Sequence, residues 1–533
     1  MKLNGLSLIG DRHGAAGGKT FTGINPADGS PLPVEFHTAS NAEVTAAAEL
    51  AAAAFLTYGR WSGAQRAAFL NRIADLLVAN TDDIVGRAHL ETGLPVARLQ
   101  GELVRTFFQM RQYAQAIASG LATGVRIDHA DPNRKPLPKP DLRSLMVPLG
   151  PVAVFGASNF PLAYSVAGGD TASALAAGCP VVVKAHPAHP GTSEVVGGLI
   201  QRAVRESGAP SGTFSLLFDA GHEVGVALVK HPLIKAVGFT GSRRGGRALM
   251  DLAAARPNPI PVYAEMSSIN PVCILAGALR ERAEEIATGL HASVTLGVGQ
   301  FCTKPGLVLV EEGINAAMGA DAFRSKLAAL MAGASPATML TPGIGAAYRS
   351  GVQTFSRSAG VKCLARSADG SGPTSAGATL FETEAAIFLA NRSLMEEIFG
   401  PATLVVTCSS TAQILEVVGR LEGQLTATIH ATQEELLAHQ ELVFALGTKA
   451  GRLVYNGFPT GVEVAHAMTH GGPYPATSDG RSTSVGTRAI ERFQRPLTFQ
   501  NFPDAALPPE LQEANPTGFA RLCDGVLKPH ICG

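Results

Sequence analysis

Cys302 stands in a short stretch of small, polar and turn-forming residues at 299–305, rather than within an apolar helix or strand pattern. A cysteine in such a setting is predicted to be accessible, and an accessible thiolate attacks electrophilic carbon. A lone cysteine is weak evidence, because free cysteine is among the most buried residue types and usually packs as a small hydrophobe. The prediction that Cys302 is a nucleophile therefore depends on companion residues elsewhere in the chain.

Two further side chains have types that suit a nucleophilic reaction. Asn159 lies in the turn 156–161 after an apolar stretch, where its amide can donate to a developing oxyanion; an awkward turn conformation is the alternative reason for an asparagine there. Glu265 lies between apolar and small residues at 262–268, where desolvation is expected to raise its pKa toward the range of a general base. A surface glutamate is the alternative.

A third group of residues suits a bound nucleotide. Lys184 ends the apolar run 180–184, and an ammonium at the carboxyl end of a strand can hold a ribose or phosphate. A glycine turn leads into a helix after residue 242, and a helix N-terminus binds anions, although the turn lacks the GxGxxG pattern. Glu397 adds a carboxylate beside the ring of Phe399. The candidate cofactor contacts in the turn are Phe239, Thr240, Gly241 and Ser242.

The elements that must position these residues alternate between short apolar strands and helices. This alternation is typical of an α/β fold with a doubly wound parallel sheet, which binds ligands at the carboxyl ends of its strands. Helical spacing of apolar residues predicts helices earlier in the chain, at 41–56, 61–80 and 96–118. The expected α/β elements are strands at 152–155, 180–184, 213–217 and 236–240, and helices at 163–177, 192–207, 224–230 and 245–255.

Composition limits the class of partner. The 533 residues are enough for two to four domains, and Lys+Arg balance Asp+Glu at 43 each, so a nucleic acid is not the expected partner. Seven scattered cysteines without CxxC spacing argue against a disulfide framework or a zinc site, so we expect no metal and a reducing cytoplasm. Because no run reaches the length of a membrane span, we expect a small-molecule partner and no membrane.

Taken together and in this order, these motifs resemble the NAD(P)-dependent aldehyde dehydrogenase superfamily. The resemblance covers residues 21–503, and no single motif carries it. The stretches at 158–163, 184–187, 264–271 and 456–462 are similar to the 2-oxoglutarate semialdehyde (2,5-dioxopentanoate) dehydrogenase branch. Ser158 stands where the family often has Trp, and Met266-Ser267-Ser268 stands where it often has Leu-Gly-Gly. These two differences concern the shape of the pocket more than the mechanism.

The resemblance implies a thiolate mechanism. Cys302 would attack the aldehyde, and Asn159 with the Cys302 backbone N–H would hold the oxyanion of the thiohemiacetal. Hydride would pass to the nicotinamide, and Glu265 would activate the water that hydrolyses the thioester. The resemblance also implies that Lys184 and Glu397 hold the adenosine-side and nicotinamide-side riboses. Phe399 would pack near the nicotinamide ribose, and Ser242 would meet the pyrophosphate.

Two other functions are the alternatives to an aldehyde-oxidising enzyme. A catalytically silent binding protein on the same fold would be free to lose the cysteine or the glutamate, and this chain has both. An acylating dehydrogenase that passes the thioester to coenzyme A generally lacks the water-activating glutamate. The presence of Glu265 therefore favours hydrolysis.

The resemblance also implies a domain layout. Residues 1–130 and 150–270 would form a cofactor-binding domain, and residues 271–480 a catalytic domain with the nucleophilic cysteine. An arm made of 131–149 and 487–503 would build homodimers or homotetramers. The tail 504–533 is expected to wrap over the surface or to be partly mobile.

Cofactor and substrate preferences depend on a few positions. Many NAD-preferring relatives have an acidic residue three places after the lysine, which would repel a 2′-phosphate; Pro187 stands there, so NADP is permitted and slightly favoured over NAD. The expected reaction is oxidation of 2-oxoglutarate semialdehyde to 2-oxoglutarate, with Arg111 or Arg481 binding the carboxylate. A medium- or long-chain fatty aldehyde is the alternative, for which Phe160 and Phe301 could line an apolar funnel.

Overall fold

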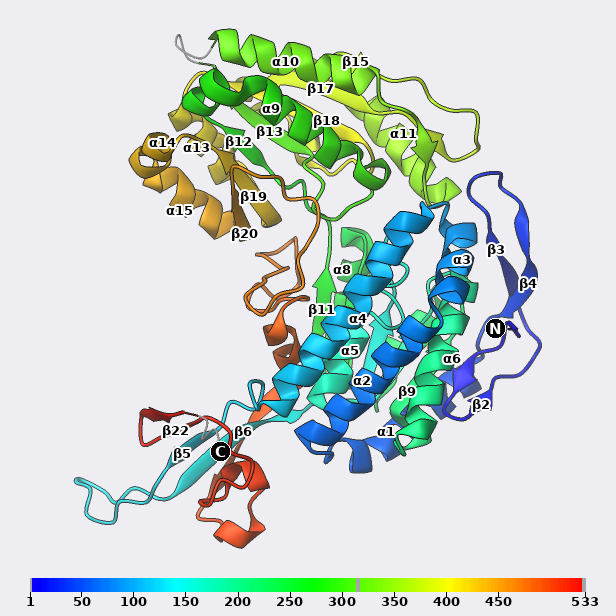
Figure 1. Ribbon diagram of the computed structural model, residues 1–533, viewed down its shortest axis with the longest axis vertical. Helices are drawn as coiled ribbons and strands as arrows, with labels where there is room; N and C mark the ends of the chain where they lie inside the picture. The colour runs from blue at the N-terminus through cyan, green and yellow to red at the C-terminus, as the bar shows by residue number, and fades with distance from the viewer. Residues whose placement is uncertain (1, 313–316, 530–533) are drawn as a thin grey trace.

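The protein is described by a computed structural model that covers residues 2–312 and 317–529. Its main bodies are two seven-stranded sheets covered by helices, and a five-stranded sheet forms an arm (Figure 1). In Figure 1 the second sheet with its helices lies at the top, the first lies below it and the arm extends at the lower left. The predicted α/β fold with a parallel sheet covered by helices is confirmed.

The first sheet has the order β11-β10-β7-β8-β9-β1-β2, and its strands from β11 to β9 run parallel. Strands β7, β8 and β9 are buried along their whole length, as expected for a parallel sheet with both faces covered. The strands are Leu8–Ile9 (β1), Arg12–His13 (β2), Val152–Phe155 (β7), Val181–Lys184 (β8), Phe214–Leu217 (β9), Ala236–Thr240 (β10) and Val262–Glu265 (β11).

The helices around this sheet begin where the sequence supplies N-caps. Ser40 and Ser62 each form a capping box with the residue three places later, which satisfies backbone donors at the starts of α1 and α2. The helix expected from 163 begins only at Gly169, because residues 163–168 fold into turns. The helices are Asn41–Tyr58 (α1), Gly63–Ala79 (α2), Thr81–Thr92 (α3), Val96–Ala118 (α4), Gly169–Ala177 (α5), Pro190–Glu206 (α6), Glu223–Lys230 (α7) and Arg243–Ala254 (α8).

The second sheet has the order β15-β17-β18-β13-β12-β19-β20, with only β15 antiparallel to its neighbour. Its strands are Val272–Ile274 (β12), Leu307–Glu311 (β13), Lys362–Arg366 (β15), Thr379–Glu384 (β17), Ala402–Cys408 (β18), Gln424–His430 (β19) and Ala450–Tyr455 (β20). Its helices are Ala276–Thr295 (α9), Ala317–Ala332 (α10), Pro342–Arg357 (α11), Ala385–Ala390 (α12), Thr411–Arg420 (α13), Gln433–Ala438 (α14) and Gln440–Lys449 (α15).

Two short strand pairs and several 3-10 turns complete the regular structure. The pairs are Thr20–Ile24 (β3) with Pro31–His37 (β4), and Ala337–Thr338 (β14) with Ser375–Ala376 (β16). The 3-10 turns are Ser211–Thr213 (η1), Leu296–Gly299 (η2), Arg392–Met395 (η3), Thr487–Phe493 (η4), Asp504–Ala506 (η5) and Pro509–Leu511 (η6). Within residues 2–312 and 317–529, no helix combines the length and the apolar character needed to cross a bilayer.

The arm includes the C-terminal tail. Strand β6 (Leu142–Pro148) pairs antiparallel with β21 (Gln494–Gln500), as the sequence predicts for an arm. Strand β5 (Arg126–Asp128) pairs with β22 (Arg521–Cys523), which in turn pairs with β23 (Val526–Lys528). The tail, expected as a surface wrap or a partly mobile segment, therefore adds two strands to the arm sheet through backbone hydrogen bonds.

An ionic cluster fixes the tail to the arm. His129 Nδ1 lies 2.5 Å from Asp524 Oδ2 and its Nε2 lies 3.0 Å from Glu513 Oε2, while Lys139 and Arg143 approach the same two carboxylates at 3.4 and 3.2 Å. Hydrogen bonds to Asp524 and Glu513 raise the pKa of His129 above its ordinary value. A raised folded-state pKa means that this contribution to stability is complete below the unfolded value and is lost as pH rises through the folded value.

We therefore expect docking of the tail to weaken as the pH rises above neutrality. Amide hydrogen exchange of β22, corrected for the intrinsic rate at each pH, should accelerate as the pH rises above about 6.5, the ordinary pKa of histidine. His129→Gln should remove most of this dependence. A pH dependence that survives in the variant would assign the effect to another group.

The segment 456–486 links the two main bodies. It leaves the end of β20, and in Figure 1 it runs as the orange chain between the two sheets. At its far end the Met266 N–H donates to the Ala476 carbonyl at 2.7 Å, and Glu265 forms a β-bridge with Thr477. A segment without regular secondary structure is thus fixed beside the end of β11.

Candidate active site

The loop that carries Cys302 requires glycine at one position. Within η2, which follows α9, the backbone is left-handed at three successive residues, with φ of 56° at Gly297, 59° at Val298 and 64° at Gly299. A Cβ on Gly299 would lie 2.3 Å from the Gly400 carbonyl, so only glycine permits this approach. A β-branched residue at positive φ costs roughly 1–3 kcal/mol, so the loop is strained at Val298.

Asn270 holds the other side of this loop. Its Nδ2 donates to the Cys302 carbonyl at 2.8 Å and to the Lys304 carbonyl at 3.0 Å, and its side chain is completely buried. These bonds fix the backbone on both sides of Thr303. The Cys302 side chain itself is partly exposed and opens into a cavity.

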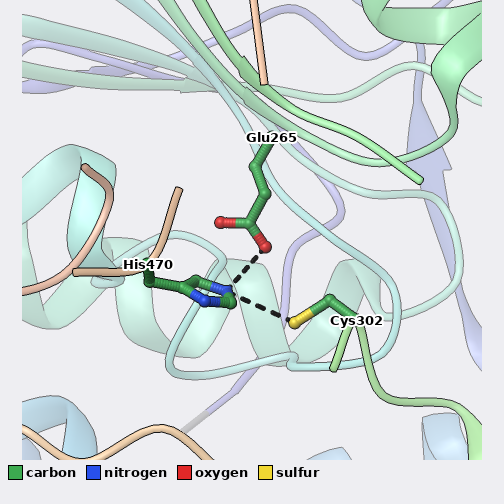
Figure 2. A group of neighbouring side chains, drawn as sticks. All are labelled: Glu265, Cys302 and His470. Atoms are coloured by element: carbon green, nitrogen blue, oxygen red, sulfur yellow. Dashed lines mark hydrogen bonds and ion pairs between the residues drawn. The ribbon is translucent and has the colours of Figure 1, made fainter. Parts of the chain in front are cut away.

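Cys302 meets two other titratable side chains (Figure 2). His470 Nε2 lies 3.4 Å from Cys302 Sγ and 2.8 Å from Glu265 Oε1. The second oxygen of Glu265 accepts a hydrogen bond of 2.7 Å from the Ser484 hydroxyl. Glu265 ends β11, whereas His470 and Ser484 come from the segment between the two bodies, so the group exists only when both bodies are assembled.

The prediction of a raised pKa for Glu265 is wrong. Burial does raise the pKa, but the electrostatic interaction with His470 and the hydrogen bond from Ser484 outweigh it, so the pKa lies below its ordinary value. Glu265 is therefore a carboxylate at neutral pH. The sequence could not predict this, because these partners are distant in the chain.

The Cys302 thiol is held in its neutral form. Burial raises the pKa of the thiol well above its ordinary value, and the Glu265 carboxylate raises it further by its charge. The Arg105 guanidinium acts in the opposite direction, with a smaller effect. Attack on a substrate therefore needs a group that removes the thiol proton, and His470 Nε2 and Glu265 are within reach.

Asn159 lies against the cysteine loop. Its Nδ2 donates to the Gln300 carbonyl at 3.0 Å, and its own backbone carbonyl accepts a bond of 2.8 Å from Arg98. Asn159 follows β7 and is buried. The loop residue that its amide contacts, Gln300, is two residues before Cys302. The structure thus brings together the amide, the thiol and the carboxylate that the sequence predicts.

A cavity of about 500 Å³ opens at Cys302 and is lined by three arginines. Arg98 and Arg105 come from α4, and Arg452 comes from β20. The guanidinium of Arg98 stacks over the rings of Phe160 and Phe301, at 5.1 and 5.0 Å from their centroids. The predicted aromatic lining is present, but a cation covers both rings.

Two of these guanidiniums have buried N–H groups without a hydrogen-bond partner in the described parts of the chain. Arg105 donates to the Val462 carbonyl and the Tyr164 hydroxyl, at 3.1 and 3.0 Å, and its Nη1 has no partner. Arg452 donates to the carbonyls of residues 459 and 461, and its Nε has no partner. Buried unpaired donors are costly, so a bound anion would stabilise them.

The two arginines predicted to bind a substrate carboxylate do not line this cavity. Arg111 pairs with Asp75 at 2.9 Å, and Arg481 is 91% exposed and pairs with Asp479 at 2.9 Å. Helix geometry explains the error on α4, since Arg111 follows Arg105 by six residues and points about 240° away around the helix axis. Arg98 precedes Arg105 by seven residues, or about two turns, and shares its face.

The predicted cofactor residues lie along the carboxyl edge of the first sheet. Lys184 and Thr240 end the parallel strands β8 and β10, and the Ser242 side chain caps α8 by accepting from the Gly245 N–H at 3.2 Å. Lys184 Nζ donates to the Asp219 carbonyl at 2.7 Å, and burial lowers its pKa to about 8. A buried ammonium and a helix N-terminus on the same edge of a sheet suit the ribose and phosphates of a dinucleotide.

Glu397 lies on the other side of the site, on the stretch that Gly299 contacts. Burial raises its pKa, while the Lys304 ammonium, the Ser267 hydroxyl and the Ser268 N–H act against this. Its charge also acts to raise the pKa of the Cys302 thiol. Phe399 is half-buried beside it. The residues present therefore fit a nicotinamide dinucleotide whose reactive end approaches Cys302.

Sequence reasoning missed His470, Ser484 and the three arginines of the cavity. A signal existed for one pair, since Arg98 and Arg105 are spaced by two helical turns beside a predicted helix face. No local pattern marks His470, which lies 168 positions from Cys302 in a segment without regular structure.

The chain is similar to known proteins over nearly its whole length. Residues 13–494 match the model of the aldehyde dehydrogenase family. The chain is 52% identical to alpha-ketoglutaric semialdehyde dehydrogenase 2 of Azospirillum brasilense and 47% identical to alpha-ketoglutaric semialdehyde dehydrogenase of Acinetobacter baylyi, each over 98% of this chain and 99% of the relative.

Solved structures show the same fold. The aldehyde dehydrogenase KauB of Pseudomonas aeruginosa superposes with a TM-score of 0.80 at 23% identity, over 94% of this chain and 97% of the other. An NAD+ complex of an aldehyde dehydrogenase from Bacillus cereus gives a TM-score of 0.79 at 22% identity, over 93% and 96%. The chain belongs to the aldehyde dehydrogenase family of NAD(P)-dependent oxidoreductases.

Proposed function

We propose that the protein oxidises 2-oxoglutarate semialdehyde to 2-oxoglutarate. The observation that carries this proposal is the set of three arginines, two with unpaired buried N–H groups, around the cavity into which Cys302 opens. A short substrate with an aldehyde at one end and a carboxylate at the other suits a thiol facing guanidinium groups. The names of two relatives with full-length similarity support the same substrate.

The proposed reaction begins at the thiol. Cys302 Sγ attacks the aldehyde carbon while its proton passes to His470 Nε2, 3.4 Å away. Asn159 Nδ2 leaves the Gln300 carbonyl to donate to the oxyanion of the thiohemiacetal. NAD(P), when bound, supplies the acceptor for the hydride that this carbon loses. Glu265 then takes a proton from the water that attacks the resulting thioester, and the departing Cys302 thiolate recovers its proton from His470 as the acid is released.

The charge of the site suits this sequence. Glu265 is a carboxylate at neutral pH because its pKa is lowered, so it is ready to accept a proton. Ser484 holds one of its oxygens and leaves the other facing the thiol and the imidazole. Loss of either contact would free the carboxylate to rotate, so Ser484 is a positioning residue.

The substrate is tested by initial rates of cofactor reduction with 2-oxoglutarate semialdehyde, hexanal and decanal. We expect kcat/KM for the semialdehyde to exceed that for hexanal by about 100-fold or more, which corresponds to roughly 2.7 kcal/mol of transition-state binding. A preference for decanal would instead show that the rings of Phe160 and Phe301 dominate and would support a fatty aldehyde dehydrogenase.

Arg105→Met tests the guanidinium directly. A charge-assisted hydrogen bond contributes about 1.5–3 kcal/mol, so kcat/KM for the semialdehyde should fall about 10- to 100-fold. The rate with hexanal should change little, since it has no carboxylate. Arg111→Met, on the exposed face of the same helix, is the matched control. Equal losses on both aldehydes would mean that Arg105 supports the site without binding the carboxylate.

Cofactor preference and assembly form part of the proposal. We propose that NADP is accepted and slightly favoured, because Pro187 places no carboxylate near the 2′-position and Lys184 adds a positive charge. The ratio of kcat/KM for the two cofactors tests this preference.

We propose that the arm builds homodimers or homotetramers. Light scattering of the full chain and of a chain without the arm contacts would measure the two molar masses.

A further inference from the structure

Three atoms of the kinds that bind zinc converge in the site (Figure 2). Cys302 Sγ, His470 Nε2 and Glu265 Oε1 all lie within 4.8 Å of one another. Thiolate, imidazole and carboxylate are the ligands that Zn²⁺ takes in proteins. No sequence pattern predicts this group, because its members have none of the short spacings of zinc motifs.

One of these atoms lacks a regular hydrogen bond within the described residues. Glu265 Oε1 is buried and forms an ion pair with His470 Nε2 at 2.8 Å, but it accepts no hydrogen bond. Its sister oxygen is satisfied by Ser484. An unsatisfied buried carboxylate oxygen is costly, and a cation placed between Oε1, Nε2 and Sγ would satisfy it.

The distances suit a tetrahedral ion. Zn–N and Zn–S bonds of about 2.0 and 2.3 Å at a tetrahedral angle separate the nitrogen from the sulfur by about 3.5 Å, and His470 Nε2 lies 3.4 Å from Cys302 Sγ. The same geometry separates nitrogen and oxygen by about 3.3 Å, so Glu265 Oε1 must move outward from its 2.8 Å contact. Three protein ligands leave a fourth position for water on the side of the cavity.

We propose that this group is an inhibitory Zn²⁺ site that reversibly blocks the nucleophile of the enzyme. Binding forms one Zn–S bond, and the thiol proton of Cys302 leaves to solvent, so no oxidant or reductant takes part. The sulfur electrons that would attack the aldehyde are then committed to the metal. The site does not depend on the identity of the aldehyde, since its three ligands are the proposed reacting groups and not the arginines that would bind the substrate carboxylate.

Calorimetric titration of the full chain with Zn²⁺, without added thiols, tests the proposal independently of turnover. We expect one Zn²⁺ per chain, no binding to this site in Cys302→Ser, and affinity lowered at least about tenfold in His470→Asn. Co²⁺ should give a thiolate-to-metal absorption band that is missing in Cys302→Ser. Cys363→Ser and His466→Asn are the controls, because each removes an exposed residue of the same type and should leave binding unchanged.

Activity provides the second measurement. Zn²⁺ should inhibit the unsubstituted enzyme competitively with the aldehyde, and EDTA should restore the rate. Binding that is unchanged in Cys302→Ser, or lost in Cys363→Ser or His466→Asn, would place the metal elsewhere and overturn the proposal. The absence of stoichiometric binding at micromolar Zn²⁺ would overturn it as well. Thermal melting of each variant confirms that it is folded, and a failed substrate test leaves these results unaffected.

Discussion

Cys302→Ala should abolish aldehyde-dependent reduction of the cofactor, with kcat lowered at least about 10⁴-fold. The sulfur is the atom that bonds to substrate, and no other described cysteine lines the cavity. Alanine leaves a small space beside His470 and Glu265, so the site should keep its shape. Steady-state absorbance of the reduced cofactor measures the effect.

Binding measurements separate loss of chemistry from loss of folding. Cys302→Ala should still bind NAD(P), since the cofactor residues lie on β8, β10 and the start of α8. Cys363→Ala removes an exposed thiol from β15 and should retain the full rate. Turnover by Cys302→Ala above about 1% of the normal rate would rule out this cysteine as the nucleophile.

Glu265→Gln should separate the two halves of the reaction. The amide keeps the size of the side chain and can still accept from Ser484, but it cannot take a proton from water. We expect steady-state turnover to fall about 10²- to 10⁴-fold, the usual contribution of a general base. A burst of about one reduced cofactor per active site should remain, because thioester formation precedes the step that needs Glu265. Stopped-flow absorbance resolves the burst.

Hydroxylamine provides a rescue for this variant. It attacks a thioester without help from a base, so it should restore turnover in Glu265→Gln and release a hydroxamate. A variant without a burst would mean that Glu265, rather than His470, takes the thiol proton of Cys302. Glu434→Gln, an exposed residue at the start of α14, is the control for removal of a carboxylate.

The parallel sheet could be predicted because its signals are local. Apolar strands such as 152–155 and 236–240 match the observed strands residue for residue, since continuous burial on both faces demands continuous apolar sequence. The helix expected from 163 was placed six residues too early, because composition does not show that 163–168 turns back on itself. The tail was not predicted to pair with β5, since short strands depend on the partner that they meet.

The sequence by itself determined the family, the fold class and the residue types of the reaction. Asn159 follows the predicted strand 152–155 and Glu265 ends the observed strand β11, so their approach follows from parallel strands that end at a common edge, whereas Cys302 comes from the loop after α9 and η2. Only the tertiary structure decided the ionisation of these residues and the side chains that surround them. His470, Ser484 and Arg452 reach the site from segments far along the chain, and pKa values, cavities and metal geometry depend on such contacts rather than on neighbours in sequence.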